Sequence, residues 1–502
     1  MPHASRRSVV GFAPLFTLLC LSACDSRTAG TETASASSAT NPLARPAAIP
    51  ITSASDEARK LYLDGRALSE QLRAHDARRL YQQAVAKDSS FALAHYQLAI
   101  NAPTAKEFFE HLKHAVSLAD KASEGERLMI LALEAGGNAK PAKALEYQQE
   151  LVAKFPRDER AHFTLGGAYF GRQEYDRAIA EYRAATQINP GFSPAYNLLG
   201  YAYRAVERFP DAEQAFKKYI ELIPGDPNPY DSYAELLMKT GRFDESIAQY
   251  QKALTVDSNF TPSKVGIATN RMLQGRHDEG GALMKRLYAA ARDDGDRRTA
   301  LVTRAIIFVD GGRTDAAVRE IDRLATFDAG RGDSANMSGD AQLAGDVLLD
   351  AGRADAAAKR YATALALIEA SGLSDDVKQD ARLAHRYNRA RVALAKGDVA
   401  TAKSEAASYM QGANARQNTF RMQQAHALHG TIALAERQFD AALAHLGEAN
   451  QQDPQVLYWT ALAWKRSGEA AKSKEFAGRA ANANILPLVT YAFVRQKAKK
   501  LG

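Results

Sequence analysis

Small side chains recur along the chain with a period of 34 residues. The eighth and twentieth positions hold Gly, Ala or Ser in all five of the windows that start at Gly125, Glu159, Ser193, Pro227 and Thr261. Within a window, apolar residues recur every three or four positions, as they do on one face of an amphipathic helix. The pattern predicts two antiparallel helices per window, which the small residues allow to approach closely.

Other positions support the same helical hairpin. Large residues such as Tyr182 and Phe216 occupy the twenty-fourth position, where they fill the space beside the small ones. Proline at the thirty-second position of three windows ends the second helix, because it lacks a backbone N–H and disfavours a helical residue before it. The register extends to 58–91 and more loosely to 92–124. After about Gly295 the period breaks, and helix pairs are predicted at 298–331, 338–371, 383–415, 423–453 and 454–487.

The hairpin pattern resembles the tetratricopeptide repeat, strongly over 125–260, fairly over 58–124 and weakly over 298–487. The resemblance implies an all-α fold: an α-solenoid in which about 11–12 pairs of antiparallel helices form a right-handed superhelix. We expect a regular array over 56–294, degenerate repeats over 295–487, and a capping helix over 488–502 that covers the last apolar face.

The N-terminus has the pattern of an export signal. Arg6 and Arg7 precede an uncharged apolar stretch that is too short to span a bilayer. It ends in Leu21-Ser22-Ala23-Cys24, which resembles the lipobox of bacterial lipoproteins and implies that Cys24 is acylated after residues 1–23 are removed. An uncleaved anchor, a plain secretory signal with an incidental cysteine, and a twin-arginine signal are the alternatives.

Residues 24–55 are rich in Ser, Thr, Ala and Pro and have few large apolar groups, so we predict a disordered tether. Together with the lipobox, this segment predicts a lipid-anchored, extracytoplasmic protein of the bacterial cell envelope. It would face the periplasm from the inner or the outer membrane, and the sequence does not decide between the two.

The composition of the chain excludes several classes of function. The 502 residues include 65 Lys and Arg against 58 Asp and Glu, a near balance that gives no signal for nucleic-acid binding. Apolar residues make up 46%, which excludes disorder of the whole chain. The two cysteines, Cys20 and Cys24, both lie near the N-terminus, so the body can form neither a disulfide framework nor a cysteine zinc site.

No catalytic motif is present, and we predict neither an enzyme nor a bound metal or small-molecule cofactor. The pairs His111/His114 and His426/His429 have helical spacing, but no third ligand follows nearby in the sequence, so ordinary packing or surface histidines are expected. Arg331-Gly332-Asp333 reads as a polar linker. The mixed charges at 292–298 read as a solvated hinge, and the basic end from Arg495 to Lys500 as a solubilising last turn or a minimal lipid contact.

In the family that the chain resembles, the first helix of each hairpin lines a concave face, and ligands usually contact its positions 2, 5, 9 and 12. The resemblance therefore implies a partner-binding groove that contains Phe163, Phe170, Asn197, Tyr201, Arg204, Asn228, Asp231 and Glu235. This mixture of aromatic and polar groups suits a protein or peptide partner. We expect Tyr201 and Asp231 to face outward, and Arg204 to offset the charges of Asp231 and Glu235 in one contiguous patch.

These features favour a membrane-tethered tetratricopeptide scaffold that mediates protein–protein interaction, in envelope complex assembly or maintenance. One alternative is a lipoprotein that captures a peptide or a glycan. Another is an enzyme with an unrecognised site in 298–487.

Overall fold

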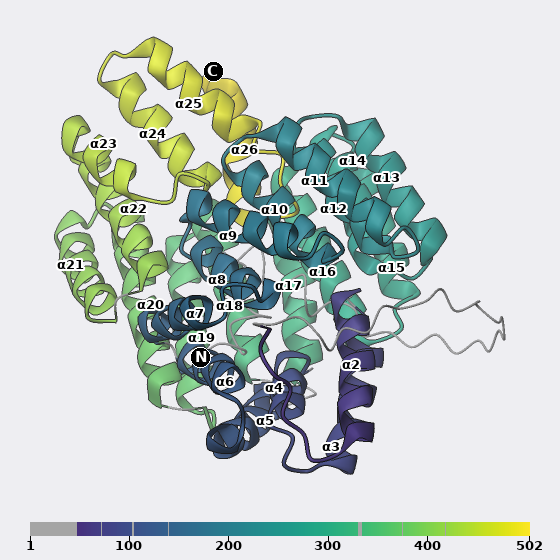
Figure 1. Cartoon of the computed structure of the whole chain (residues 1–502). Coiled ribbons are helices and arrows are strands. Elements are labelled where there is room, and N and C mark those ends of the chain that lie inside the picture. Colours follow the sequence, from purple (N-terminus) through teal and green to yellow (C-terminus); the bar gives the residue numbers. More distant parts are fainter. Residues whose placement is uncertain are drawn as a thin grey trace. The chain divides into compact units, whose positions relative to one another are not determined.

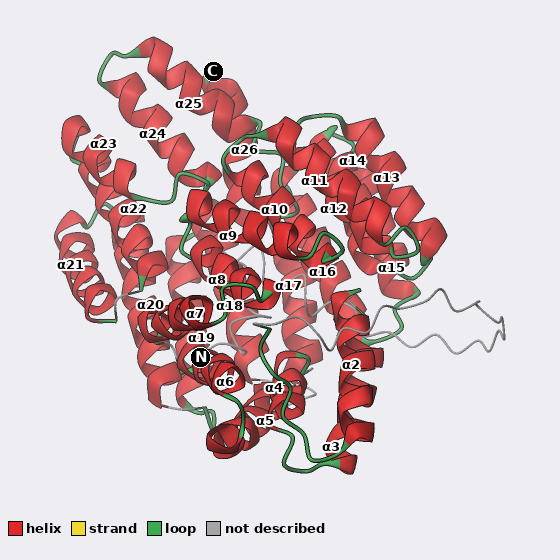
Figure 2. Cartoon of the chain, viewed as in Figure 1, coloured by secondary structure: helices red, strands yellow, loops and turns green. Residues whose placement is uncertain are grey.

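The computed structural model describes residues 48–71, 73–102, 105–138, 140–329, 334–373, 375–416 and 418–502. Helices joined by short loops make up these ranges, and no strand occurs within them (Figures 1 and 2). The predicted all-α class of paired antiparallel helices is confirmed. Residues 1–23, Cys24 and Arg331-Gly332-Asp333 lie outside the described residues, so the signal peptide, the lipid anchor and the linker stay predictions.

The chain divides into two compact units, the first of which ends at Pro229. Its helices pair as successive hairpins. They are α2 (Asp56–Glu70), α3 (Ala74–Lys87), α4 (Ala92–Ile100), α5 (Ala105–Leu118), the 3₁₀ turn η2 (Ala119–Lys121), α6 (Glu124–Gly137), α7 (Pro141–Lys154), α8 (Glu159–Gly171), α9 (Tyr175–Ile188), α10 (Ser193–Ala205) and α11 (Phe209–Leu222).

The second unit runs from Tyr230 to Gly502, and α12 (Pro227–Lys239) spans the border. The helices that follow are α13 (Phe243–Val256), α14 (Thr261–Leu273), α15 (His277–Ala289), α16 (Asp294–Asp310), α17 (Thr314–Ala329), α18 (Ser334–Asp350), α19 (Ala354–Glu369), α20 (Asp375–Ala395), α21 (Val399–Ala415), α22 (Thr419–Ala435), α23 (Phe439–Glu448), α24 (Pro454–Arg466), α25 (Ala470–Ala481) and α26 (Val489–Leu501). None of the described helices is long and apolar enough to cross a membrane.

A glycine on the first helix faces a large side chain on the second in five hairpins, always 16 residues later. The pairs are Gly65 with Tyr81, Gly166 with Tyr182, Gly200 with Phe216, Gly345 with Tyr361, and Gly430 with Leu446. A Cβ atom at any of these glycines would lie within 2.9 Å of the facing side chain, closer than real Cβ contacts allow. The predicted close approach of the two helices is confirmed, and it continues into the irregular C-terminal repeats.

The mixed charges near residue 295 do not form a solvated hinge, and that expectation was wrong. Asp293 caps the N-terminus of α16, and Asp296 is buried, where it accepts a hydrogen bond from Thr261 at 2.5 Å. Arg298 is largely buried between Asp328 and Asp340 and forms ion pairs with both. These charges therefore join α16 to its neighbours, because Asp296 pairs with Arg292 before the helix and Arg298 with acids of two other helices.

The C-terminal helix does more than cover the last hairpin. It packs against α25 and α24, as a cap would, but also against α16. Phe493 and Val494 share an apolar cluster with Ile306 and Leu343, which come from helices far earlier in the chain. The second unit is therefore joined by contacts between distant repeats as well as by stacking of neighbours.

Arg495 belongs to this junction, so its expected place in a solvated last turn was wrong. Its guanidinium is 2% exposed and forms two hydrogen bonds with the fully buried carboxylate of Asp310, at 2.6 and 2.7 Å. It also donates to the carbonyl oxygens of Met272 and Leu273 at 3.1 Å, which caps the C-terminal end of α14. Lys497 pairs with Asp350 at 2.7 Å.

Candidate interaction sites

The residues predicted for the groove lie on the first helices of three successive hairpins, as expected, but most of them are buried. Phe163 and Phe170 lie on α8; Asn197, Tyr201 and Arg204 lie on α10; Asn228, Asp231 and Glu235 lie on α12. Of these eight, only Phe163 and Arg204 are partly exposed. A partner would find little accessible surface on the other six.

Contacts within α10 and α11 explain the burial of Tyr201. Its ring packs edge-on against Phe216, with 5.2 Å between the ring centroids, and the Arg204 guanidinium lies 4.6 Å above it. Tyr201 is therefore a core residue of the hairpin, and the expectation that it faces outward was wrong. Asn228 is buried in a similar way and donates a hydrogen bond to the Tyr219 hydroxyl at 3.0 Å.

Asp231 is also buried, at 1% exposure, so it does not face outward either. Ser263 donates a hydrogen bond to its carboxylate at 2.6 Å. Burial and the nearby carboxylate of Glu235 raise the pKa of Asp231 well above its usual value. The expected patch that joins Asp231 to Asn197 and Arg204 would span the two compact units, and it stays a prediction.

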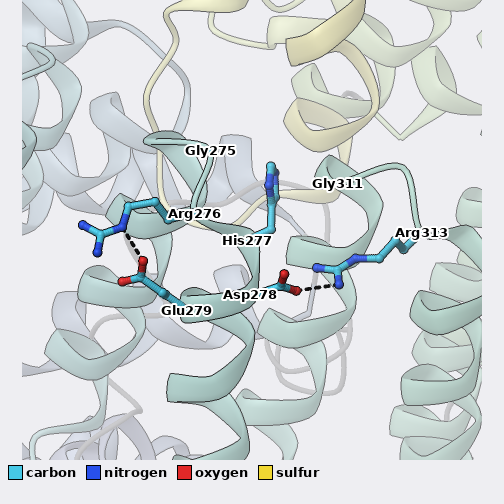
Figure 3. A pocket seen from close by; sticks show the side chains of 7 residues that line it. All are labelled: Gly275, Arg276, His277, Asp278, Glu279, Gly311 and Arg313. Carbon is cyan, nitrogen blue, oxygen red and sulfur yellow. Dashed lines mark hydrogen bonds and ion pairs between the residues drawn. The ribbon is translucent and has the colours of Figure 1, made fainter.

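One hollow lies on the second unit, at the tips of two neighbouring hairpins (Figure 3). Its cavity volume is about 350 Å³, and it is open to solvent. The residues that line it are Gly275, Arg276, His277, Asp278, Glu279, Gly311 and Arg313. Gly275 has a positive φ of 81°, which lets the chain turn sharply between α14 and α15.

The charges around the hollow neutralise one another in pairs. Figure 3 shows Arg276 paired with Glu279, and Arg313 paired with Asp278 across the two hairpin tips. The Nε2–H of His277 donates to the Asp310 carboxylate at 2.7 Å, and Arg495 binds the same carboxylate. Burial alone would raise the pKa of Asp310, but Arg495 and His277 lower it below its usual value. The hollow therefore offers polar contacts from two ion pairs and the imidazole of His277.

Each of the two histidine pairs singled out in the sequence gains a third histidine from the facing helix. His95 lies beside His111 and His114, with 3.5 Å between the Nδ1 atoms of His95 and His111. His445 lies beside His426 and His429, with 3.2 Å between the Nδ1 atoms of His426 and His445. In the described residues, no three His, Cys, Asp or Glu side chains are placed to hold a metal ion.

Burial favours the neutral form of some of these histidines. Burial and the two neighbouring imidazoles lower the pKa of His95 to about 4. Burial also lowers the pKa of His429 and His445, again with a contribution from histidine neighbours. Each cluster is packed and contains one contact between two imidazole nitrogens.

Residues 48–55 form an ordered segment, although a disordered tether was expected there; for these residues that expectation was wrong. They form an extended strap that contacts the loops before α4, α6 and α8. Ile49 is buried at 3% exposure, and its N–H donates to Asp158 at 2.9 Å. The one available signal was Ile49-Pro50-Ile51, an apolar group inside a polar stretch.

Comparison with known proteins supports the repeat assignment over part of the chain. Family models described as "Tetratricopeptide repeat" match residues 131–191, 193–226 and 228–260. The chain therefore contains tetratricopeptide repeats on both sides of the border at Pro229. The matched residues agree with the region where the 34-residue period is strongest.

Curated relatives match only short stretches. "Superkiller complex protein 3" of Mus musculus is 27% identical over 133 residues, which are 26% of this chain and 8% of the relative. The chloroplastic tetratricopeptide protein PYG7 of Arabidopsis thaliana is 30% identical over 89 residues, which are 17% of this chain and 29% of the relative. The chain thus spans less than a third of either protein.

Among solved structures, a tetratricopeptide repeat protein from Parabacteroides merdae is similar with a TM-score of 0.37 and 15% identity. That alignment covers 51% of this chain and 96% of the other.

Proposed function

We propose that this protein is a membrane-tethered, extracytoplasmic scaffold that binds a protein partner during assembly or maintenance of the cell envelope. The observation that carries the proposal is the series of stacked helical hairpins, with tetratricopeptide repeats over 131–260. Stacked hairpins present an extended surface, which suits binding to another polypeptide. The lipobox at Cys24 supports the location.

Buried groove residues restrict where a partner can bind. Phe163 and Arg204 keep accessible surface, whereas Tyr201 and Asp231 are held inside the hairpins. We expect a partner to use the exposed residues of the array, and the buried residues to act by keeping the helices in register.

Cross-linking in native membranes, followed by mass spectrometry, tests the proposal. The wild-type protein should carry a lipid on Cys24, fractionate with membranes and yield reproducible cross-links to one or a few envelope proteins. The matched control is Cys24→Ala, which should lose the lipid and the membrane association. A wild-type protein without lipid would refute the location, and a wild-type protein without specific cross-links would refute the scaffold role.

A further inference from the structure

The strap formed by residues 48–55 follows the loop edge of three successive hairpins. Its N–H groups reach one buried acid in each: Ala54 donates to Asp88 at 2.8 Å, Thr52 to Glu126 at 2.8 Å, and Ile49 to Asp158 at 2.9 Å. The chain runs backwards along the array, since the earliest strap residue meets the latest hairpin. We call Asp88, Glu126 and Asp158, with the socket of Ile49, the strap site.

The spacing of these contacts fits any extended chain. Neighbouring packed helices lie about 8–10 Å apart, and an extended chain rises about 3.3 Å per residue. Two or three residues therefore carry an extended segment from one hairpin to the next. The strap advances two residues between Asp88 and Glu126, and three between Glu126 and Asp158.

The strap site binds the backbone of its occupant and some of its side chains. Three main-chain N–H groups and the Ser53 hydroxyl donate to the acids, the hydroxyl to Asp88 at 2.7 Å, whereas Pro50, Thr52 and Ala54 are exposed. Ile51 is partly buried against the apolar core, and the Ile49 side chain is fully buried. It fills a socket beside Gly125 and Phe155, where a Cβ atom on Gly125 would lie 2.7 Å from the isoleucine.

The acids are held in place by their own loops. One oxygen of Asp158 caps α8 by accepting from the N–H groups of Arg160 and Ala161, while the other accepts from the strap. Glu126 divides its oxygens in the same way between the N–H of Ser123 and that of Thr52.

The two carboxylate oxygens of Asp88 are also shared between its own loop and the strap. One oxygen binds the N–H and hydroxyl of Ser90, and the other binds the strap. Because local contacts orient all three carboxylates, the site stays formed when the strap leaves.

We propose that the strap site is a binding site for an extended segment of a partner protein, and that residues 48–55 occupy it in cis until such a segment displaces them. The occupant needs an aliphatic side chain in the Ile49 socket, and free N–H groups three and five residues later. The proposal deepens the scaffold role by naming the partner class. Its test uses only this chain and its own peptide, so its failure is distinguishable from that of the scaffold role.

A fluorescent peptide with the sequence of residues 48–55 is the probe, and the full chain is the receptor. Ile49→Asp in the chain should release the strap, because a carboxylate would enter an apolar socket beside Asp158. The released chain should bind the peptide at least about tenfold more tightly than wild type, since the resident strap competes at millimolar effective concentration. Fluorescence anisotropy measures the affinities.

Matched variants locate the binding. A peptide with proline at position 52 lacks the N–H that donates to Glu126, so it should not bind. The native proline at position 50 shows that the strap tolerates a proline where no N–H is needed. Gly125→Leu in the released chain fills the socket and should abolish binding. Hydrogen exchange should show loss of protection at Ile49 and Thr52 in the released chain, with α6 unchanged.

Two results would overturn the proposal. One is a released, folded chain that binds the peptide no more tightly than wild type does. The other is wild-type protection of the Ile49 and Thr52 amides equal to that of the α6 core, because the strap would then open only when the hairpins unfold. The second measurement needs no variant, so it applies even if Ile49→Asp unfolds the chain.

Discussion

Two adjacent glycines on α8 provide a direct test of the hairpin packing. A Cβ atom on Gly166 would lie 2.6 and 2.7 Å from two carbons of the Tyr182 ring, whereas one on Gly167 would meet only the Tyr182 hydroxyl at 3.9 Å. Both residues lie within the same helix, so replacement by alanine gives each a similar gain in helix propensity, about 1 kcal/mol. The steric contact with Tyr182 is the difference between them.

Overpacking a core costs about 1–3 kcal/mol. We therefore expect Gly167→Ala to stabilise the hairpin by up to about 1 kcal/mol, and Gly166→Ala to leave it unchanged or destabilise it by up to about 2 kcal/mol. The two variants should differ by about 1–3 kcal/mol. Adding Tyr182→Ala to Gly166→Ala should relieve the clash, because it removes the ring that the new Cβ atom meets, so the double variant should lose less stability than the sum of the single losses.

Hydrogen exchange of peptides from α8 and α9 is the suitable assay, because an array of repeats unfolds locally and a single melting temperature does not describe it. Free energies of local opening follow from the protection of these peptides. Equal effects of Gly166→Ala and Gly167→Ala would show that Tyr182 does not pack against the glycine. A fully additive double variant would show the same.

Three further changes have defined outcomes. Arg495→Met leaves the buried Asp310 carboxylate without its guanidinium partner, with only His277 beside it, and should cost up to about 3–5 kcal/mol, seen as faster exchange in α26. Adding Asp310→Leu should restore most of the loss, and an unchanged α26 would contradict the buried pair. The pKa of His95 is about 4 in the folded chain against about 6.5 when unfolded, so the unfolded state binds the proton first and stability falls as the pH drops from about 6.5 to 4. Between pH 7 and pH 5 the free energy of unfolding should fall by about 1–2 kcal/mol after allowance for solvent screening. Urea titrations at the two pH values should show this decrease for the wild type and a smaller decrease for His95→Gln. Ala212→Leu should overpack α11 against α10 by about 1–3 kcal/mol, and unchanged hydrogen-exchange protection of peptides from α10 and α11 would refute the register.

The hairpins could be predicted from sequence because their contacts are local and periodic. Small residues at the eighth and twentieth positions mark where two helices touch, and the large residue 16 positions after the glycine fills the space beside it. Tyr361 and Leu446 keep this rule in the irregular repeats. Proximity in the chain and proximity in space coincide within a hairpin, so a sequence period is sufficient to find the contact.

Burial of the groove residues could not be predicted in this way. The repeat positions that usually contact ligands in the resembling family placed the eight residues on the first helices of the hairpins. They did not show which of these side chains the neighbouring helices cover. Tyr201 has an aromatic ring and a hydroxyl, which are common in binding sites, yet its ring packs against Phe216 from the second helix of the same hairpin. The histidine clusters illustrate the same limit, because His95 and His445 join their partners only through the pairing of helices.

Contacts between segments far apart in the sequence were the hardest to predict. Near both ends of the described array, a buried carboxylate makes such a contact. Asp158 caps its own helix and binds Ile49, 109 residues away; Asp310 binds His277 and also Arg495, 185 residues away. A carboxylate has about four lone pairs, so it can accept from a nearby group and from a distant segment at once: Asp158 uses a different oxygen for each, whereas in Asp310 Arg495 binds both oxygens and His277 shares one of them. Nothing in the repeat pattern singles out such an acid, because its distant partner lies outside the period. An acid that is fully buried at a hairpin end, with one oxygen engaged locally, is therefore the feature to examine when a terminal segment of a repeat array has no assigned place.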